Sequence, residues 1–192
     1  MEKLTKLEKC YIDTTKYLKS IGLNTFLYSS PLLQLIRDGE IKERHRFDRE
    51  LNIGCLDEDL TDKMIKRIGK DYNWVKLGES SKVGRGIIYF GSKDSKNLWG
   101  DKDFFTLLAP FSLVGDLRVE YMGGGICKTW PKRHYENLGT IDYKGYTFNI
   151  PNDPEGWLEH YYGQDWREEQ LDWHWQTDAK NVKRLVNIWD YK

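Results

Sequence analysis

The chain has 192 residues with 30 basic and 30 acidic side chains, so its formal net charge is zero. This balance excludes the strong general attraction to phosphate backbones that a non-specific nucleic-acid-binding protein needs. The 8 Trp, 12 Tyr and 7 Phe supply apolar surface for a core, and no apolar run approaches the roughly 20 residues of a membrane span. We expect a single domain over residues 1–192, a cytoplasmic location, no membrane span and no nucleic-acid partner.

The first 70 residues predict helices and strands in alternation. Apolar side chains recur at helical spacing before Gly22, a short apolar run follows, and Ser29-Ser30-Pro31 is typical of a helix start. Polar and apolar residues alternate over 47–56, as in a strand. Residues 57–70 are acidic at the beginning and basic at the end, as a helix dipole favours. The expected elements are a helix over 3–21, a strand over 25–28, a helix over 32–37, a strand over 47–56 and a helix over 57–70.

The rest of the chain is rich in expected strands. Short apolar runs separated by Gly, Ser and Asp predict strands, and a hairpin, a short helix and an irregular aromatic tail from residue 164 follow. The strands are expected over 74–77, 86–90, 104–108 and 117–121, the hairpin over 142–150 and the helix over 153–162. Together these elements predict an α+β fold in which helices flank a small mixed β-sheet.

The segment DRELNIG, residues 48–54, is the most informative for chemistry. Side chains alternate along a strand, so Asp48, Glu50 and Asn52 are expected on one face. Three oxygen-bearing side chains in a row suit a divalent cation such as Mg²⁺ or Mn²⁺, which would in turn hold the phosphates of a nucleotide. The alternative is an exposed edge strand with a solvated polar face.

A second candidate is the turn that leads into the predicted helix at residues 32–37. The N-terminus of a helix directs backbone N–H groups and a positive partial charge at whatever lies above it, which suits a phosphate. Ser30 lies at this turn, and Arg37 could add a bidentate phosphate contact. For Arg37 the alternative is a surface salt bridge.

These segments, taken in order, resemble the LicD/fukutin family of nucleotidyltransferase-fold phosphotransferases. FLYSSPLLQLIRDGEI (26–41) followed by DRELNIG (48–54) is similar to the family's apolar strand, Gly-Thr-Leu-Leu-Gly turn, Arg and Asp-rich strand. FNIP (148–151), WL (157–158) and YYGQDW (161–166) resemble its Val-Pro, Tyr-Leu and Tyr-Gly-x-x-Trp ending. LDWHW (171–175), followed by Asn181, is closer to the fukutin branch. The resemblance is interrupted but spans nearly the whole chain.

The resemblance implies a nucleotidyltransferase-like core and a defined reaction. Family members transfer a phosphorylated alcohol from a CDP-linked donor to a sugar hydroxyl, with a metal ion bridging carboxylates and donor phosphates. The resemblance thus implies a nucleotide-activated donor and a glycan or glycolipid acceptor. By this resemblance Glu50 and Asn52 occupy the two central acidic positions and Asp48 precedes them, which makes these three the expected metal ligands. Glu120 is the expected further carboxylate, so the expected catalytic residues are Asp48, Glu50 and Glu120. Ser30 and Arg37 correspond to donor-binding positions.

The departures from the family pattern lie at the site itself. Asn52 replaces an Asp and lacks its charge, and Ser30-Pro31 replaces Gly-Thr, which removes an N–H and some backbone freedom. Two hypotheses follow. The chain is either a working metal-dependent transferase or a non-catalytic relative that binds a nucleotide, a glycan or a protein.

A few other residues have a chemical and a structural interpretation. Trp173 and Trp175 are typical of a core, with sugar stacking as the alternative. His45 and His134 are candidate general bases for the acceptor hydroxyl, although a lone His is more often structural. The Gly123-Gly124-Gly125 segment lacks the strand and helix context of a dinucleotide motif and is expected to be a loop.

Overall fold

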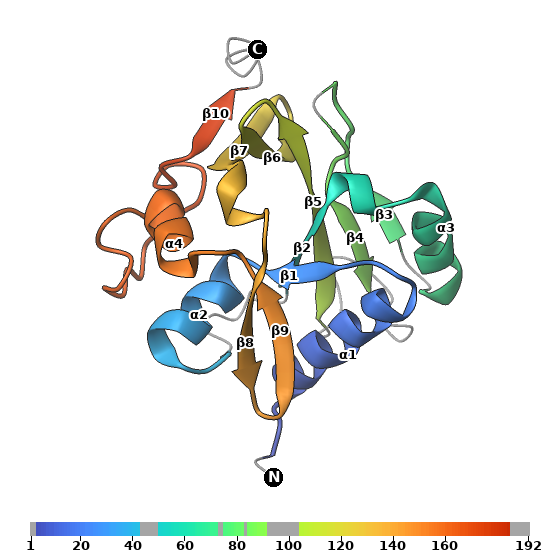
Figure 1. Cartoon of the computed structure of the whole chain (residues 1–192), viewed down its shortest axis with the longest axis horizontal. Helices are drawn as coiled ribbons and strands as arrows, with labels where there is room; N and C mark the ends of the chain where they lie inside the picture. The colour runs from blue at the N-terminus through green and yellow to red at the C-terminus, as the bar shows by residue number, and fades with distance from the viewer. Residues whose placement is uncertain (1–2, 43–49, 73–74, 83, 92–103, 185–192) are drawn as a thin grey trace.

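The structure, a computed structural model, describes residues 3–42, 50–72, 75–82, 84–91 and 104–184. It combines four α-helices with a mixed β-sheet, as predicted from the sequence (Figure 1). The α-helices are α1 (Lys6–Ser20), α2 (Ser30–Asp38), α3 (Asp62–Asp71) and α4 (Pro154–Tyr162). Short 3-10 turns lie at Asp57–Asp59 and Lys132–His134.

Eight strands form the main sheet. They are β1 (Thr25–Leu27), β2 (Glu50–Leu56), β3 (Val75–Leu77), β4 (Ile88–Gly91), β5 (Phe105–Val114), β6 (Leu117–Gly123), β7 (Ile126–Pro131) and β10 (Val182–Arg184). A separate hairpin consists of β8 (Gly139–Tyr143) and β9 (Tyr146–Ile150). Neither β7 nor β10 is predicted from the sequence, so the sheet is extended by two strands at this end.

Strand β5 organises the sheet because its two halves have different partners. Along one edge it runs parallel to β2 over its first seven residues. Along the other edge, Phe105–Leu108 pairs with β4 and Ser112–Val114 pairs with β6, both antiparallel. This ten-residue strand therefore joins the β3–β4 pair and the β6–β7–β10 group to the β1–β2 pair. The sequence predicts only the first half of β5, because a proline within an apolar run usually argues against a continuing strand. The strand nevertheless continues through Pro110, which is paired with Cys55 of β2.

The helix predicted over 57–70 is divided. Asp57–Asp59 forms a 3-10 turn, and α3 begins only after Thr61, whose side chain accepts a hydrogen bond from the N–H of Met64. Such an N-cap is the usual start signal of a helix, so the local sequence does mark this boundary. Among the described residues, no helix combines the length and the apolar character that crossing a bilayer requires.

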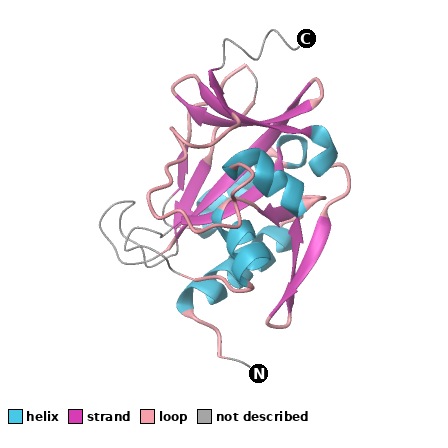
Figure 2. Cartoon of the chain, turned by 90° about the vertical axis from the view of Figure 1, so that its left-hand side faces the viewer, coloured by secondary structure: helices cyan, strands magenta, loops and turns pink. Residues whose placement is uncertain are grey.

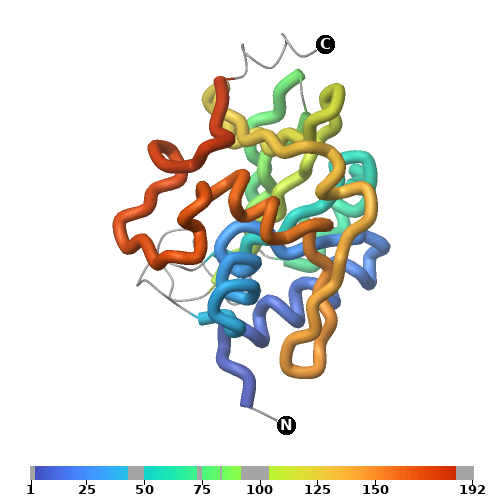
Figure 3. The backbone as a smooth tube through the Cα atoms, turned by 60° about the vertical axis from the view of Figure 1, so that its left-hand side comes forward, coloured from blue at the N-terminus to red at the C-terminus, as the bar shows by residue number. Residues whose placement is uncertain are grey.

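The core is strongly aromatic where the two ends of the chain meet. The rings of Trp130 on β7 and Trp157 on α4 stack with centroids 5.1 Å apart, and both side chains are fully buried. Tyr28, directly after β1, packs edge-to-face against Trp157 and Phe111. These contacts hold α4 against the sheet beside α2, and the chain after α4 then returns to the sheet as β10 (Figures 2 and 3).

Candidate functional site

One pocket collects the predicted site residues that the structure describes. It has a volume of about 300 Å³ and is bordered by β2, α2, the β6–β7 hairpin and the chain around and after α4. Ser30, Arg37, Glu50, Asn52 and Glu120 all line it. Asp48, the remaining predicted residue, lies outside the described residues. Side chains separated by up to 90 positions are thus brought to one place by the sheet.

Strand β2 presents its polar side chains to this pocket by simple alternation. Glu50 is exposed and Asn52 half-buried, whereas Leu51 and Ile53 are buried. The Nδ2 of Asn52 donates a hydrogen bond to Oγ of Ser30, at 3.4 Å. The predicted common face for positions 50 and 52 is therefore confirmed.

The alternative of an exposed edge strand is wrong for β2. Its C-terminal half lies between β1 and β5. At its N-terminal half the Tyr11 hydroxyl takes the place of a neighbouring strand: it accepts from the N–H of Asn52 at 3.2 Å and donates to the carbonyl of Glu50 at 3.3 Å. The backbone is thereby fixed from both sides where the polar side chains begin.

The start of α2 has an unusual backbone. Ser29, at the N-cap position, has φ 58°, which is unfavourable for a residue with a Cβ, and its side chain makes no capping hydrogen bond. Its carbonyl accepts from the N–H of Leu33, so the helix begins immediately after it. The first-turn N–H groups of α2 therefore lack the side-chain cap that usually satisfies them, and Ser29 and Ser30 border the pocket.

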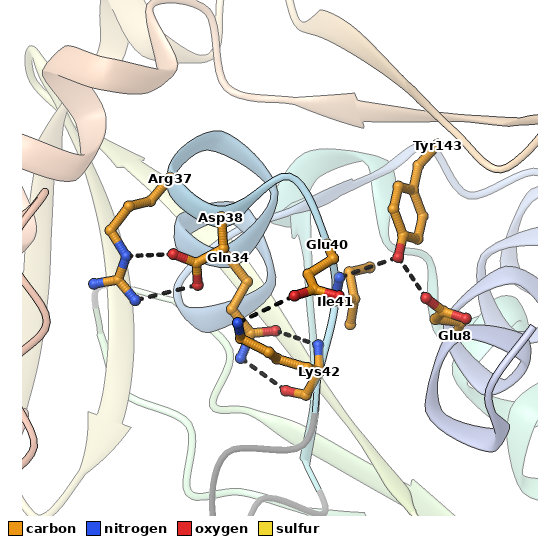
Figure 4. A network of polar contacts seen from close by, with 8 residues as sticks. All are labelled: Glu8, Gln34, Arg37, Asp38, Glu40, Ile41, Lys42 and Tyr143. Atoms are coloured by element: carbon orange, nitrogen blue, oxygen red, sulfur yellow. Dashed lines mark hydrogen bonds and ion pairs between the residues drawn. The ribbon is translucent and has the colours of Figure 1, made fainter.

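Arg37 is already paired. Its Nε donates to Oδ1 of Asp38 at 2.8 Å and its Nη2 to Oδ2 at 3.3 Å, as Figure 4 shows. Its Nη1 also reaches the carbonyl of Glu168 at 3.4 Å. The side chain is 9% exposed, so the salt bridge foreseen as the alternative is present, but in a largely buried setting. A phosphate would have to share Arg37 with Asp38.

Glu120 is the most buried of the predicted site residues that the structure describes, at 1% exposed. Its Oε1 accepts a hydrogen bond from the Tyr28 hydroxyl at 2.8 Å, and its Oε2 lies 3.5 Å from Nζ of Lys128. No described residue donates a hydrogen bond to Oε2. Burial, together with the negative charge of Glu120, raises the pKa of Tyr28 well above its ordinary value, so Tyr28 remains a neutral donor.

Aromatic side chains from α4 and the chain beyond it form a further part of the pocket wall. Tyr161 and Tyr162 at the end of α4 and Trp166, Trp173 and Trp175 beyond it border the pocket. The Trp173 ring packs against both tyrosines, with centroids 5.3 and 4.7 Å away. Trp173 and Trp175 are half-buried, which places them between the two predicted roles: they pack against neighbours and also face the pocket.

His134, one of the two candidate general bases, is not brought to this pocket. His134 is buried after β7, where its Nδ1 lies 3.0 Å from the carbonyl of Asn152, and it borders a separate surface hollow. Its predicted role is therefore wrong for this site, because the 3-10 turn at Lys132–His134 directs the ring to the chain before α4. His45 lies outside the described residues. The Gly123-Gly124-Gly125 segment forms the turn between β6 and β7, with positive φ at all three residues, as expected for a loop.

Lys128 is the important site residue that sequence reasoning missed. It pairs with Glu120 in the β6–β7 register and is 5% exposed. Its ammonium group lies 5.0 Å from the ring centroids of both Tyr161 and Trp175. A signal was present: the two opposite charges lie symmetrically about Gly124, as cross-strand partners in a hairpin would.

The donor set gives a partial fit to a divalent cation. Glu50 and Asn52 offer the oxygen ligands that Mg²⁺ and Mn²⁺ accept, whereas Glu120 is bonded to Tyr28 and faces Lys128. In the described part of the chain, no group of three or more His, Cys, Asp or Glu side chains is arranged to hold a metal ion. Glu50 and Asn52 thus suit an ion that takes its other ligands from substrate and water.

No protein-family model matches the chain, and no curated protein matches it in sequence. The order of the sequence motifs and the geometry of this pocket are therefore the two observations that bear on function.

Proposed function

We propose that the chain is a metal-dependent transferase that moves a phosphorylated alcohol or sugar group from a CDP-linked, nucleotide-activated donor to a glycan hydroxyl. The observation that carries the proposal is the convergence of Ser30, Arg37, Glu50, Asn52 and Glu120 on one pocket. The sequence motifs and the family resemblance associate each of these positions with phosphate, metal or catalytic chemistry.

The donor phosphates are assigned to the start of α2. A helix N-terminus without a side-chain cap offers N–H groups and a positive partial charge to an anion. The strained backbone of Ser29 supports this assignment, since such strain is concentrated at ligand-binding positions. The aromatic wall at Trp173 and Trp175 offers ring faces for the base or for a sugar.

The reaction is an in-line displacement at phosphorus. The acceptor oxygen forms a new P–O bond while the bond to the departing nucleoside monophosphate breaks, and the hydroxyl proton is taken by a carboxylate. Glu50, exposed at the pocket wall, is the carboxylate that we assign to this proton. A bound Mg²⁺ or Mn²⁺ would neutralise charge on the phosphates, with Glu50 and Asn52 as its protein ligands among the described residues.

A second function is favoured by specific contacts. Arg37 is paired with Asp38, Glu120 faces Lys128, and an amide, Asn52, stands at an acidic position of the family pattern. These features suit a non-catalytic relative that binds a nucleotide, a glycan or a protein in the same pocket without turnover.

Ligand-dependent stabilisation followed by a turnover assay tests both functions. The protein, its Glu50→Ala variant and an exposed control, Glu136→Ala, are heated with CDP, CMP, UDP or GDP, each with and without Mg²⁺ or Mn²⁺. A ligand present at 100 times its Kd adds about 2.7 kcal/mol to the free energy of unfolding. For a domain of this size this raises Tm by about 5–11 °C.

The transferase predicts a cytidine-selective, metal-dependent shift that is lost in Glu50→Ala and kept in Glu136→Ala. It also predicts release of CMP from a CDP-linked donor. A shift without metal dependence and without CMP release identifies the non-catalytic relative. No shift with any nucleotide contradicts the nucleotide-binding role in both.

A further inference from the structure

The ammonium group of Lys128 is a buried cation with little hydrogen bonding. Its side chain is 6% exposed, and Oε2 of Glu120, the carboxylate oxygen nearest to Nζ in the described residues, accepts no hydrogen bond from it. Its contacts are the Glu120 carboxylate at 3.5 Å and the ring faces of Tyr161 and Trp175 at 5.0 Å each. A buried charge is costly unless hydrogen bonds satisfy it. Lys128 lines the pocket, so the three N–H donors of its ammonium group are available to a ligand there.

The strand register fixes this cation in place. Lys128 lies directly opposite Glu120 across β6 and β7, and the neighbouring Trp130 on the same face of β7 is fully buried in the core. The two aromatic rings attract the ammonium group through their faces, and a ring face does not accept a conventional hydrogen bond. The position of Nζ is therefore set in advance of any ligand.

The ion pair with Glu120 leaves the N–H donors unused. Oε2 of Glu120 accepts no hydrogen bond from any described residue, although it is the carboxylate oxygen that faces Nζ. Glu120 is held on its other side by the Tyr28 hydroxyl at 2.8 Å. The carboxylate thus offsets the charge of Lys128 without occupying its hydrogen-bonding directions.

We propose that Lys128 is a further ligand-binding residue of this pocket and that it binds the phosphate or diphosphate group of the ligand. The proposal rests on the proposed function in taking this pocket as the ligand site. The ligand oxygens supply the acceptors that Nζ lacks, and charge-assisted hydrogen bonds of this kind are about twice as strong as neutral ones. Tyr161 and Trp175 act as positioning residues, because they fix the ammonium group through their ring faces.

Inorganic pyrophosphate, titrated calorimetrically in EDTA and low salt, is the direct probe, since it requires neither base recognition nor a metal ion. Lys128→Met keeps the length of the side chain and removes its charge, and Lys128→Arg keeps the charge. Lys66→Met, on the exposed face of α3, is the matched control.

We expect Lys128→Met to raise the Kd for pyrophosphate at least ~10-fold, as the loss of a charged hydrogen bond requires. Lys128→Arg should recover part of the affinity, and Lys66→Met should stay within about twofold of the wild type.

A double variant keeps the test valid if Lys128→Met does not fold. Glu120→Gln with Lys128→Met removes both charges of the buried pair and so avoids leaving one of them uncompensated. It should fold and show the same loss of pyrophosphate affinity.

Two results overturn the inference: a wild-type protein that does not bind pyrophosphate, or a double variant that binds it with wild-type affinity. Neither result depends on the transferase reaction. If pyrophosphate binds through Lys128 but no CMP is released from a CDP-linked donor, the inference stands and the transferase function fails. If a cytidine nucleotide binds and turns over without help from Lys128, the transferase function stands and the inference fails.

Discussion

Two buried glutamates, Glu8 and Glu120, differ in how completely their carboxylates are satisfied. Both are at most 2% exposed, and each accepts a hydrogen bond from a tyrosine and lies beside a lysine. Glu8 also accepts from the N–H of Thr5 at 2.7 Å in a capping box, and Lys144 reaches it at 2.9 Å. Glu120 has the Tyr28 hydroxyl and a lysine at 3.5 Å, with no hydrogen bond from a described residue to Oε2.

The difference corresponds to what lies next to each carboxylate. Glu8 joins α1 to the β8–β9 hairpin through Tyr143, whose hydroxyl also accepts from the N–H of Ile41, as Figure 4 shows. Glu120 instead borders the pocket. A fully satisfied buried charge stabilises the fold, whereas an under-satisfied one at a pocket leaves bonding capacity for a ligand.

The largest expected effect is a difference in the free energy of unfolding that is lost when each carboxylate is replaced by an amide. Glu8→Gln places an NH₂ group among three donors, and we expect it to lower the free energy of unfolding by about 3 kcal/mol. Glu120→Gln combined with Lys128→Met can keep the Tyr28 hydrogen bond, leaves no buried charge uncompensated and should cost about 1 kcal/mol. Urea denaturation of both variants at pH 7 measures the two values. Equal costs, or a larger cost for the double variant at Glu120 and Lys128, would show that the two carboxylates do not differ as proposed.

Acid should expose the same contrast. Burial by itself would raise the pKa of the Glu8 carboxyl, but hydrogen bonds from Tyr143, Lys144 and the Thr5 backbone more than offset it and lower this pKa to about 2. A depressed carboxyl pKa stabilises the fold above the ordinary value of 4.5, and this contribution is lost as the pH falls from 4.5 towards 2.

The wild-type protein should therefore lose about 2 kcal/mol more than Glu8→Gln between these pH values, within the range for hydrogen bonds to a charged group. Urea midpoints at several pH values measure the slope. The same slope in both proteins would mean that Glu8 is not the responsible group.

The smallest effect compares the two lysines. The Lys144 side chain is 17% exposed where it contacts Glu8, so Lys144→Met should cost about 1 kcal/mol of stability, the upper end of the range for ion pairs that water still reaches. Its Kd for pyrophosphate should remain within about twofold of the wild type, in contrast to Lys128→Met. A matching loss of affinity in Lys144→Met would attribute the effect to general charge and not to the pocket.

Much of the local structure could be predicted because short segments carry their own signals. Helical spacing and a stop at Gly22 marked α1, and alternation placed Glu50 and Asn52 on one face. The helix predicted over 153–162 corresponds to α4, which begins at Pro154 after the Asp153 cap and ends before Gly163. Strand β7 was missed because its residues, ICKTWP, combine a buried lysine with a core tryptophan and so lack a clean alternation of polar and apolar side chains.

The sequence by itself determined the approximate positions of the four described helices and of most strands, which β2 side chains share a face and which residues are chemically suited to phosphate or a metal. The tertiary structure alone decided that these residues meet at one pocket, that Arg37 is bound to Asp38, and that Lys128 stands opposite Glu120 beneath two aromatic rings. The physical reason is that periodicity and caps act over a few residues, whereas the partner of a buried charge is chosen by strand pairing and by packing between distant segments.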